Sequence, residues 1–95
     1  MNLSTVIHDA KGKPIMDEGS PWTMAAAIGA ALLGGANTEG IGGNEKFRRF
    51  KLAQKVASQE SVEFDESEKK IIKDVTGEAY FPIVVGQIYE ALGEK

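Results

Sequence analysis

Residues 65–92, DESEKKIIKDVTGEAYFPIVVGQIYEAL, decide the fold, because this stretch predicts two helices in succession. Asp65 and Glu68 have the spacing of a capping box, with Asp65 as N-cap and Glu68 three positions later. We expect the first of the two helices to end at Gly77, since glycine is favoured just beyond a helix. The side chains predicted to face inward on it are Ile71, Ile72 and Val75.

The second helix of this pair is expected from about Ala79 or Pro82 to Leu92. One face carries Ile83, Val84, Ile88 and Leu92, with Tyr80, Val85 and Tyr89 beside it. A DNA-reading helix-turn-helix is disfavoured, because such a helix should offer Arg, Lys, Asn or Gln to base edges and only Gln87 is of these types. The apolar last helix is therefore expected in a core or a protein interface.

Upstream, a helix is expected from Asn44, as N-cap, to about Ser58. Its predicted apolar stripe consists of Phe47, Phe50, Ala53 or Gln54, and Ala57, widened by Leu52 and Val56. The opposite face gathers five of the 11 cationic residues within ten positions: Lys46, Arg48, Arg49, Lys51 and Lys55. Such a run most often forms a solvated face, and an acidic protein or nucleic acid is the alternative reading.

A helix is predicted with Ser20 as N-cap and Pro21 at the first helical position, and it continues through the Ala-rich residues 23–33. Its small side chains permit close packing, so we expect it to be largely buried. Residues 34–43 contain five glycines and predict a flexible connector, because glycine loses the most backbone entropy on ordering. The P-loop pattern is absent there, since Asn44 and Glu45 follow the last glycines.

At the N-terminus, two short strands are predicted over residues 3–8 and 13–16, joined by a type I turn at residues 9–12. A lone hairpin is marginally stable, so its apolar face should lie on the helices. The expected fold is mainly α (α+β), with a short N-terminal β-hairpin followed by a compact bundle of about four helices. We expect a single domain over residues 1–95, with a flexible Gly-rich loop at 34–43.

The composition of the 95-residue chain excludes several classes of protein. There is no cysteine, so disulfide scaffolds and thiolate metal sites are excluded. The net charge is −3, which disfavours general attraction to nucleic acid. The longest apolar run, residues 24–33, is half of the about 20 residues that a membrane-spanning helix needs, and no secretory signal is apparent. No membrane association is expected.

No catalytic, cofactor-binding or metal-binding residue is predicted. His8 is the only histidine, and no nucleophile can be paired with it by spacing. The acidic stretch at residues 60–68 lacks the pattern of an EF-hand, and helix capping and solvent exposure explain it. We therefore expect a protein without enzymatic activity.

The last helix supplies the remaining interface candidates, Phe81 and Tyr89, whereas Trp22 is expected to cover the core. An alternative use of this helix is contact with a second copy of the chain in a homo-oligomer. The candidate partner-binding residues are Lys46, Arg48, Arg49, Lys51, Lys55, Phe81 and Tyr89.

Three segments, residues 9–15, 46–55 and 80–92, resemble small proteins of similar length encoded by tailed bacteriophages and prophages. The similarity covers most of the chain, but residues 34–43 are not part of it. The resemblance implies no catalytic motif and transfers no functional residue. It leads us to expect a phage or prophage protein in the host cytoplasm or on the virion, which binds a phage or host protein in virion assembly or as an accessory factor. The alternative is a regulatory or nucleic-acid-associated protein that uses the basic face of the helix at 44–58.

Overall fold

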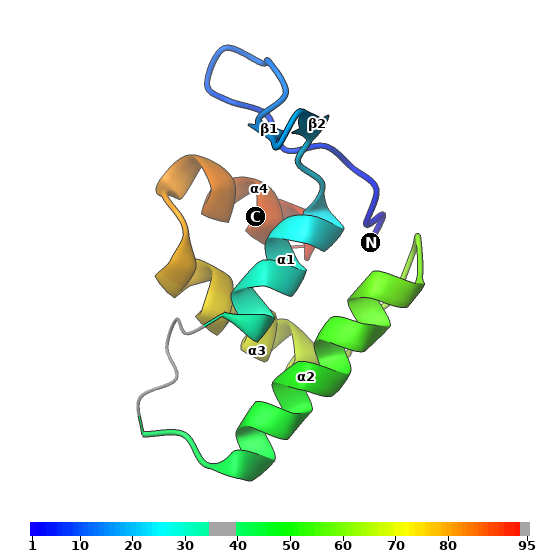
Figure 1. Cartoon of the computed structure of the whole chain (residues 1–95), viewed down its shortest axis with the longest axis vertical. Helices are drawn as coiled ribbons and strands as arrows, with labels where there is room; N and C mark the ends of the chain where they lie inside the picture. The colour runs from blue at the N-terminus through cyan, green and yellow to red at the C-terminus, as the bar shows by residue number, and fades with distance from the viewer. Residues whose placement is uncertain (35–39, 94–95) are drawn as a thin grey trace.

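The computed structural model describes residues 1–34 and 40–93, which form a short β-hairpin followed by four α-helices (Figure 1). The hairpin consists of β1 (Met16–Asp17) and β2 (Ser20–Pro21), paired antiparallel. The helices are α1 (Met24–Leu33), α2 (Gly43–Ser58), α3 (Glu66–Ala79) and α4 (Pro82–Ala91). The predicted fold class, mainly α with an N-terminal hairpin, is confirmed.

The paired strands are not the two that the sequence predicted. Glu18 and Gly19 connect β1 to β2, and their φ angles of 49° and 84° are those of a type I′ turn, which matches the twist of a two-residue hairpin. The predicted strand at 3–8 contributes only isolated bridges, because its backbone groups form hydrogen bonds with several different segments of the chain. Ile7 donates its N–H to Trp22, Leu3 donates to Glu60, and Ile7 accepts from Ile15.

The predicted turn at residues 9–12 does form. The Gly12 N–H donates to the Asp9 carbonyl at 3.0 Å, and Gly12 has a φ of 82°, which glycine adopts without strain. His8 forms a bridge with Pro14, so the turn closes a protruding loop rather than a long ladder.

The predicted start of the first helix is wrong. Ser20 and Pro21 form β2, and the N-cap is Thr23, whose hydroxyl accepts the Ala26 N–H at 3.2 Å. Pairing with β1 competes with the helical entry that Ser-Pro favours, so the helix begins three residues later. At the other end, Gly34 donates its N–H to the Ala30 carbonyl. Half of the predicted Gly-rich loop, residues 35–39, lies outside the described residues, and Gly43 at its end already belongs to α2.

The remaining helices follow the sequence closely. α2 begins at Gly43, with Gly42 rather than Asn44 at the N-cap. The capping box of α3 is confirmed, although the helix continues past Gly77 to Ala79. Of the two predicted starts for the last helix, the structure has Pro82, with Phe81 as N-cap.

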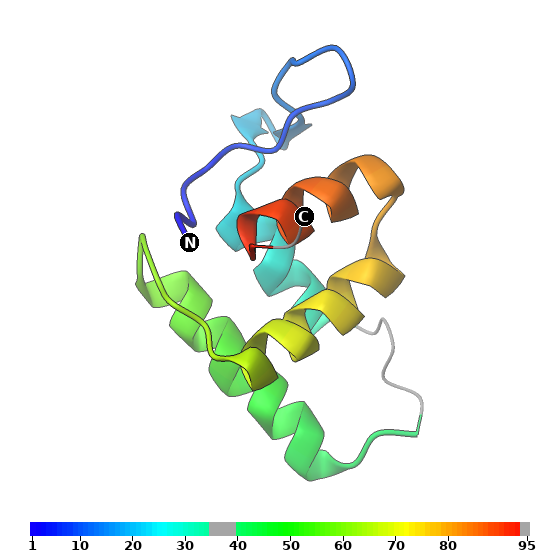
Figure 2. The same cartoon turned by 180° about the vertical axis from the view of Figure 1, so that it is seen from behind.

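The core lies where α1 crosses the other elements, and Figure 2 shows the same arrangement from behind. Its most buried side chains include Ile28 of α1, Val56 of α2, Ile72 of α3 and Ile88 of α4. Leu3 and Ile7 from the N-terminal segment are also completely buried. The N-terminal segment therefore belongs to the core, while α2 extends away from it at one end of the molecule (Figures 1 and 2).

Candidate surface on helix α2

The buried side of α2 differs from the predicted one. Leu52, Ala53 and Val56 face the core, as expected for part of the apolar stripe. Phe47 and Phe50, in contrast, are 60% and 46% exposed. Arg49, one turn before Ala53, faces inward instead. The buried side of α2 is therefore rotated about the helix axis from the predicted apolar stripe.

Arg49 was expected in the solvent-exposed basic face, and this placement is wrong. Its side chain is only 7% exposed, and its Nε lies 3.9 Å from Glu45 Oε1, one turn earlier on α2. An Arg stem packs well against apolar neighbours, and the nearby carboxylate offsets part of the cost of burying the charge. Arg49 is therefore placed to hold α2 against α1 rather than to meet a partner.

Two more of the predicted basic residues face α3. Arg48 lies 3.4 Å from Glu45 and donates to the Ser67 hydroxyl at 3.2 Å. Lys55 binds Glu68 at 3.0 Å and stands over the Phe64 ring. Arg48, Lys55, Ser67 and Glu68 line a hollow of about 360 Å³ between the two helices, and Phe47 and Lys51 line it as well. Their charges are partly neutralised there, so the basic cluster does not act as one face.

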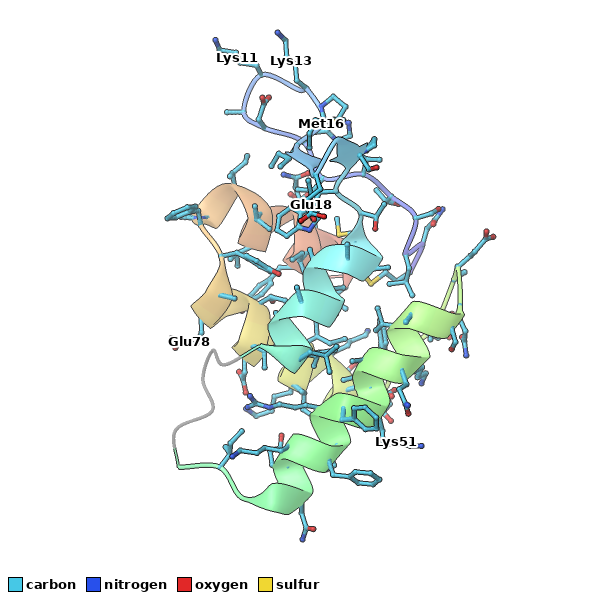
Figure 3. The ribbon with its side chains drawn as sticks, in the orientation of Figure 1. Lys11, Lys13, Met16, Glu18, Lys51 and Glu78 are labelled. Carbon is cyan, nitrogen blue, oxygen red and sulfur yellow. The ribbon has the colours of Figure 1, made fainter. Side chains whose placement is uncertain are left out.

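What α2 does present to solvent is a stripe that we call the α2 surface. Its members are Lys46, Phe47, Phe50, Lys51 and Gln54, all exposed and spaced so that they share one side of a helix. The two phenyl rings contact each other, with centroids 6.4 Å apart and an interplanar angle of 31°. Within the described residues, neither the Lys46 nor the Lys51 ammonium forms an ion pair or hydrogen bond, and Lys51 extends outward in Figure 3.

The α2 surface continues onto the end of α1. Leu33, 64% exposed, lines a small hollow together with Lys46 and Phe50. Three large apolar side chains therefore lie near one another in water, flanked by two ammonium groups. Exposed apolar patches with a polar rim are typical of contact surfaces.

The two candidates on the last helix have different surroundings. Phe81, the N-cap of α4, is 81% exposed. Tyr89 is half-buried, its hydroxyl donates to the Lys73 carbonyl at 2.8 Å, and the Lys73 ammonium stands 5.7 Å from the centre of its ring. Tyr89 thus joins α4 to α3, and Phe81 is the freer of the two.

A second apolar region, which we call the hairpin groove, did not emerge from the sequence. It has a volume of about 420 Å³ and is lined by Ile15, Met16, Asp17, Trp22, Ala30 and Tyr80. Trp22, expected to cover the core, meets Tyr80 edge-on with ring centroids 5.1 Å apart. The lining comes from the hairpin, α1 and the end of α3, so only the tertiary fold brings it together. The sequence feature that points to such a region is the number of large aromatic side chains, because a small protein cannot easily bury all of them.

Tyr80, which lines this groove, is held in place by a hydrogen bond. Its hydroxyl donates to the Ala27 carbonyl in α1. Burial raises the pKa of this hydroxyl above the ordinary value of 10.0. The wall that Tyr80 and Trp22 form is consequently neutral, apolar and held in place.

The residues considered for chemistry lie apart from one another. The backbone N–H and carbonyl of His8 are bound by the Gln87 side chain, which ties the N-terminal segment to α4. Across residues 1–34 and 40–93, no three His, Asp or Glu side chains gather as metal ligands would. In the same part of the chain, no helix has the length and apolar character to cross a bilayer.

Comparison of the chain with protein-family models, with curated proteins and with solved structures gives no match.

Proposed function

We propose that this protein acts without enzymatic activity, by binding another protein through the α2 surface. The observation that carries the proposal is the exposed, mutually contacting pair of Phe47 and Phe50 between Lys46 and Lys51. Aromatic side chains dominate the energetics of protein interfaces, whereas large phenyl rings left in water gain nothing for the monomer. The partner should offer an apolar surface with carboxylates at its rim.

The charge distribution supports an acidic partner. Residues 43–58 contain five cations against one acidic residue, a net charge of +4, while the remaining six cations and 13 acids leave the rest of the chain at −7. Arg48, Arg49 and Lys55 have carboxylates beside them, so the positive charge that faces solvent is mainly that of Lys46 and Lys51. This local positive charge on a negative molecule steers an acidic partner toward the α2 surface.

The resemblance to small phage proteins suggests where to look for this partner. We infer that it is a phage or host protein, a further copy of this chain included, met during virion assembly, in the host cytoplasm or on the virion. An accessory role outside assembly fits the same surface.

The test is affinity capture from cells that naturally produce the protein, with two variants beside the wild type. The double substitution Phe47→Ser and Phe50→Ser should reduce retention of a specific protein at least about tenfold, as expected for loss of hot-spot side chains. Phe81→Ser is the control, because it removes a ring that is even more exposed from another element. Equal retention by all three forms contradicts the proposal, and loss with Phe81→Ser alone transfers the interaction to α4.

A second candidate function, nucleic-acid binding, is favoured by the alternation of cations and phenyl rings over residues 46–51. Exposed rings can stack on bases while Lys and Arg meet phosphates. This function predicts binding to single-stranded DNA or RNA that falls steeply with salt and is lost with Arg48→Glu and Lys51→Glu. Absence of binding at low salt removes it.

A further inference from the structure

We propose that the partner of the α2 surface is the hairpin groove of a second copy of this chain. The inference rests on the proposed function, since it names the occupant for the same surface. It has three supports: the composition of the two surfaces, their charges, and their positions on the molecule.

The two surfaces match in composition. The α2 surface presents two phenyl rings on a helix, which is a convex shape. The hairpin groove offers a hollow whose apolar lining includes Ile15, Met16, Trp22 and Tyr80. Met16 is 55% exposed at its edge, so part of this lining is open to water in the single chain. A phenyl ring that enters the groove meets the aromatic pair of Trp22 and Tyr80 and removes apolar area from water on both sides.

The charges match as well. Asp17 lines the groove, and Glu18 follows it at the exposed turn of the hairpin, as Figure 3 shows for Glu18. Neither carboxylate has an ion pair or hydrogen bond within residues 1–34 and 40–93. Two unengaged carboxylates beside an apolar hollow therefore complement the two unengaged ammonium groups beside the phenyl rings. Such pairing at the rim fixes orientation and selects the partner.

The positions of the two surfaces require a contact between different molecules. The hairpin stands at one end of the long axis, and the first turns of α2, which carry Phe47 and Phe50, lie at the other end (Figures 1 and 2). One copy cannot fill its own groove. Because the two halves of the contact are different patches, the association is head-to-tail, and it continues from copy to copy unless the rotation closes a ring.

Sedimentation of the purified chain tests the association directly. We expect the average mass to rise beyond that of a dimer as concentration increases. Two variants each disable one half of the contact: Phe47→Ser with Phe50→Ser on α2, and Met16→Lys in the groove. Alone, each should associate at least about tenfold more weakly than the wild type.

Mixing the two variants is the decisive step. The Met16→Lys chain retains its phenyl rings and the other variant retains its groove, so the mixture should form a one-to-one complex that grows no further. Formation of this complex also shows that both variants are folded. A wild type that stays monomeric, a mixture that stays monomeric, or undiminished self-association of either variant alone overturns the inference.

Charge reversal tests the pairing. Asp17→Lys and Lys51→Glu should each weaken association, and a chain with both changes should recover it, because the reversed charges again meet across the contact. Glu63→Lys is the control, since Glu63 is exposed beside a separate hollow that contains Met1 and Leu92. Equal weakening by Glu63→Lys, or no recovery in the double variant, contradicts the assignment of Asp17 and Lys51.

Failure of the inference and failure of the proposed function have different outcomes. If the wild type is monomeric but the α2 variant loses a different captured protein, the proposed function stands and the second copy is excluded. If the wild type self-associates and the α2 variant does so equally, while retaining every captured protein, both are wrong.

Discussion

Gln87 connects the N-terminal segment to α4 through a single side chain. Its Oε1 accepts the His8 N–H at 2.9 Å, and its Nε2 donates to the carbonyls of His8 at 2.7 Å and Ile83 at 2.8 Å. The amide thus provides the partner that a neighbouring strand would otherwise give to the His8 backbone. Buried backbone groups are costly when left without a partner, so this contact controls how firmly the hairpin end is held.

Gln87→Met should therefore lower the free energy of unfolding by about 1–3 kcal/mol, because the side chain keeps its size while the His8 backbone loses both hydrogen bonds. Urea denaturation measures the change, and hydrogen exchange at the His8 amide should accelerate. Gln59→Met, at the exposed residue that follows α2, is the control and should stay within about 0.5 kcal/mol of the wild type. An equal effect at both positions contradicts the role of Gln87.

Tyr80 gives the stability of the protein a dependence on alkaline pH. Burial raises the pKa of its hydroxyl in the folded state above 10.0, so the folded chain retains this proton when the unfolded chain has begun to release it. The contribution is complete below about pH 10 and is lost as pH rises from there through the raised folded pKa.

Ultraviolet titration of Tyr89→Phe checks this, because that variant leaves Tyr80 as the only tyrosine of the chain. We expect the phenolate to appear above pH 10 in the folded protein and closer to 10.0 in denaturant. Tyr80→Phe should flatten the loss of stability above pH 10. A folded-state titration at or below 10.0 contradicts the desolvation of this hydroxyl.

At the scale of single elements, the turn of the hairpin needs a residue that adopts a positive φ without strain. Gly19 has a φ of 84°, which side chains with a Cβ rarely adopt, whereas Gly29 is an interior residue of α1 with open space where a Cβ would stand. Gly19→Ala should destabilise the protein by about 1–2 kcal/mol. Gly29→Ala should stabilise it by about 0.5–1 kcal/mol. Thermal unfolding of the two variants should give shifts of opposite sign, and shifts of the same sign contradict this assignment.

The start of α3 is secured by two reciprocal hydrogen bonds. Asp65 Oδ1 accepts the Glu68 N–H at 2.8 Å, and Glu68 Oε1 accepts the Asp65 N–H at 3.0 Å. Asp65→Ala should cost about 1 kcal/mol of stability, while Asp65→Ser, which can still cap, should cost only a few tenths. Chemical denaturation distinguishes the two, and equal losses contradict the capping role.

These elements also show what the sequence can predict. The capping box is a local signal and predicts the start of α3 correctly, whereas the predicted end at Gly77 is two residues short. Pro82 is one of the two predicted starts of α4, and the structure has it there. The rotation of α2 was missed because two different sides of that helix carry apolar residues, Phe47 with Phe50 and Leu52 with Val56. Sequence periodicity does not show which of these two sides is buried, because the buried side also contains the charged residue Arg49, which lies beside Glu45. The hairpin moved because the segment at 3–8 has several possible backbone partners, and the choice depends on distant residues such as Gln87.

The candidate site also has a part that the sequence predicts and a part that depends on tertiary packing. The density of charge and aromatics at residues 46–55 identified α2 as the element of interest. The separation of that cluster into a buried Arg49, an inter-helix pair of Arg48 and Lys55, and an exposed stripe depends on where α1 and α3 pack. The hairpin groove combines residues from three parts of the chain, so no local sequence pattern predicts it.

At the scale of the whole molecule, the opposite net charges of α2 and of the remaining chain make self-association sensitive to salt. Raising sodium chloride from about 0.1 M to about 1 M shortens the screening length from about 10 Å to about 3 Å. Rim pairs are worth about 0.2–1 kcal/mol each, so loss of two pairs should weaken association by about twofold to thirtyfold, and the phenyl contacts should persist. Sedimentation at the two salt concentrations measures this. Association that is unchanged by salt contradicts a charged rim.

The protruding loop at residues 9–13 makes the chain convenient to label. Asp9 closes its base by donating to the Lys13 carbonyl at 2.8 Å, and Lys11 and Lys13 extend into solvent at the tip, as Figure 3 shows. Because the chain contains no cysteine, Lys11→Cys introduces a unique thiol that no core side chain contacts. A fluorophore or a heavy-atom cluster attached there would mark every molecule at one equivalent point. The spacing of such marks would reveal a repeat in any filament or ring by energy transfer or electron microscopy.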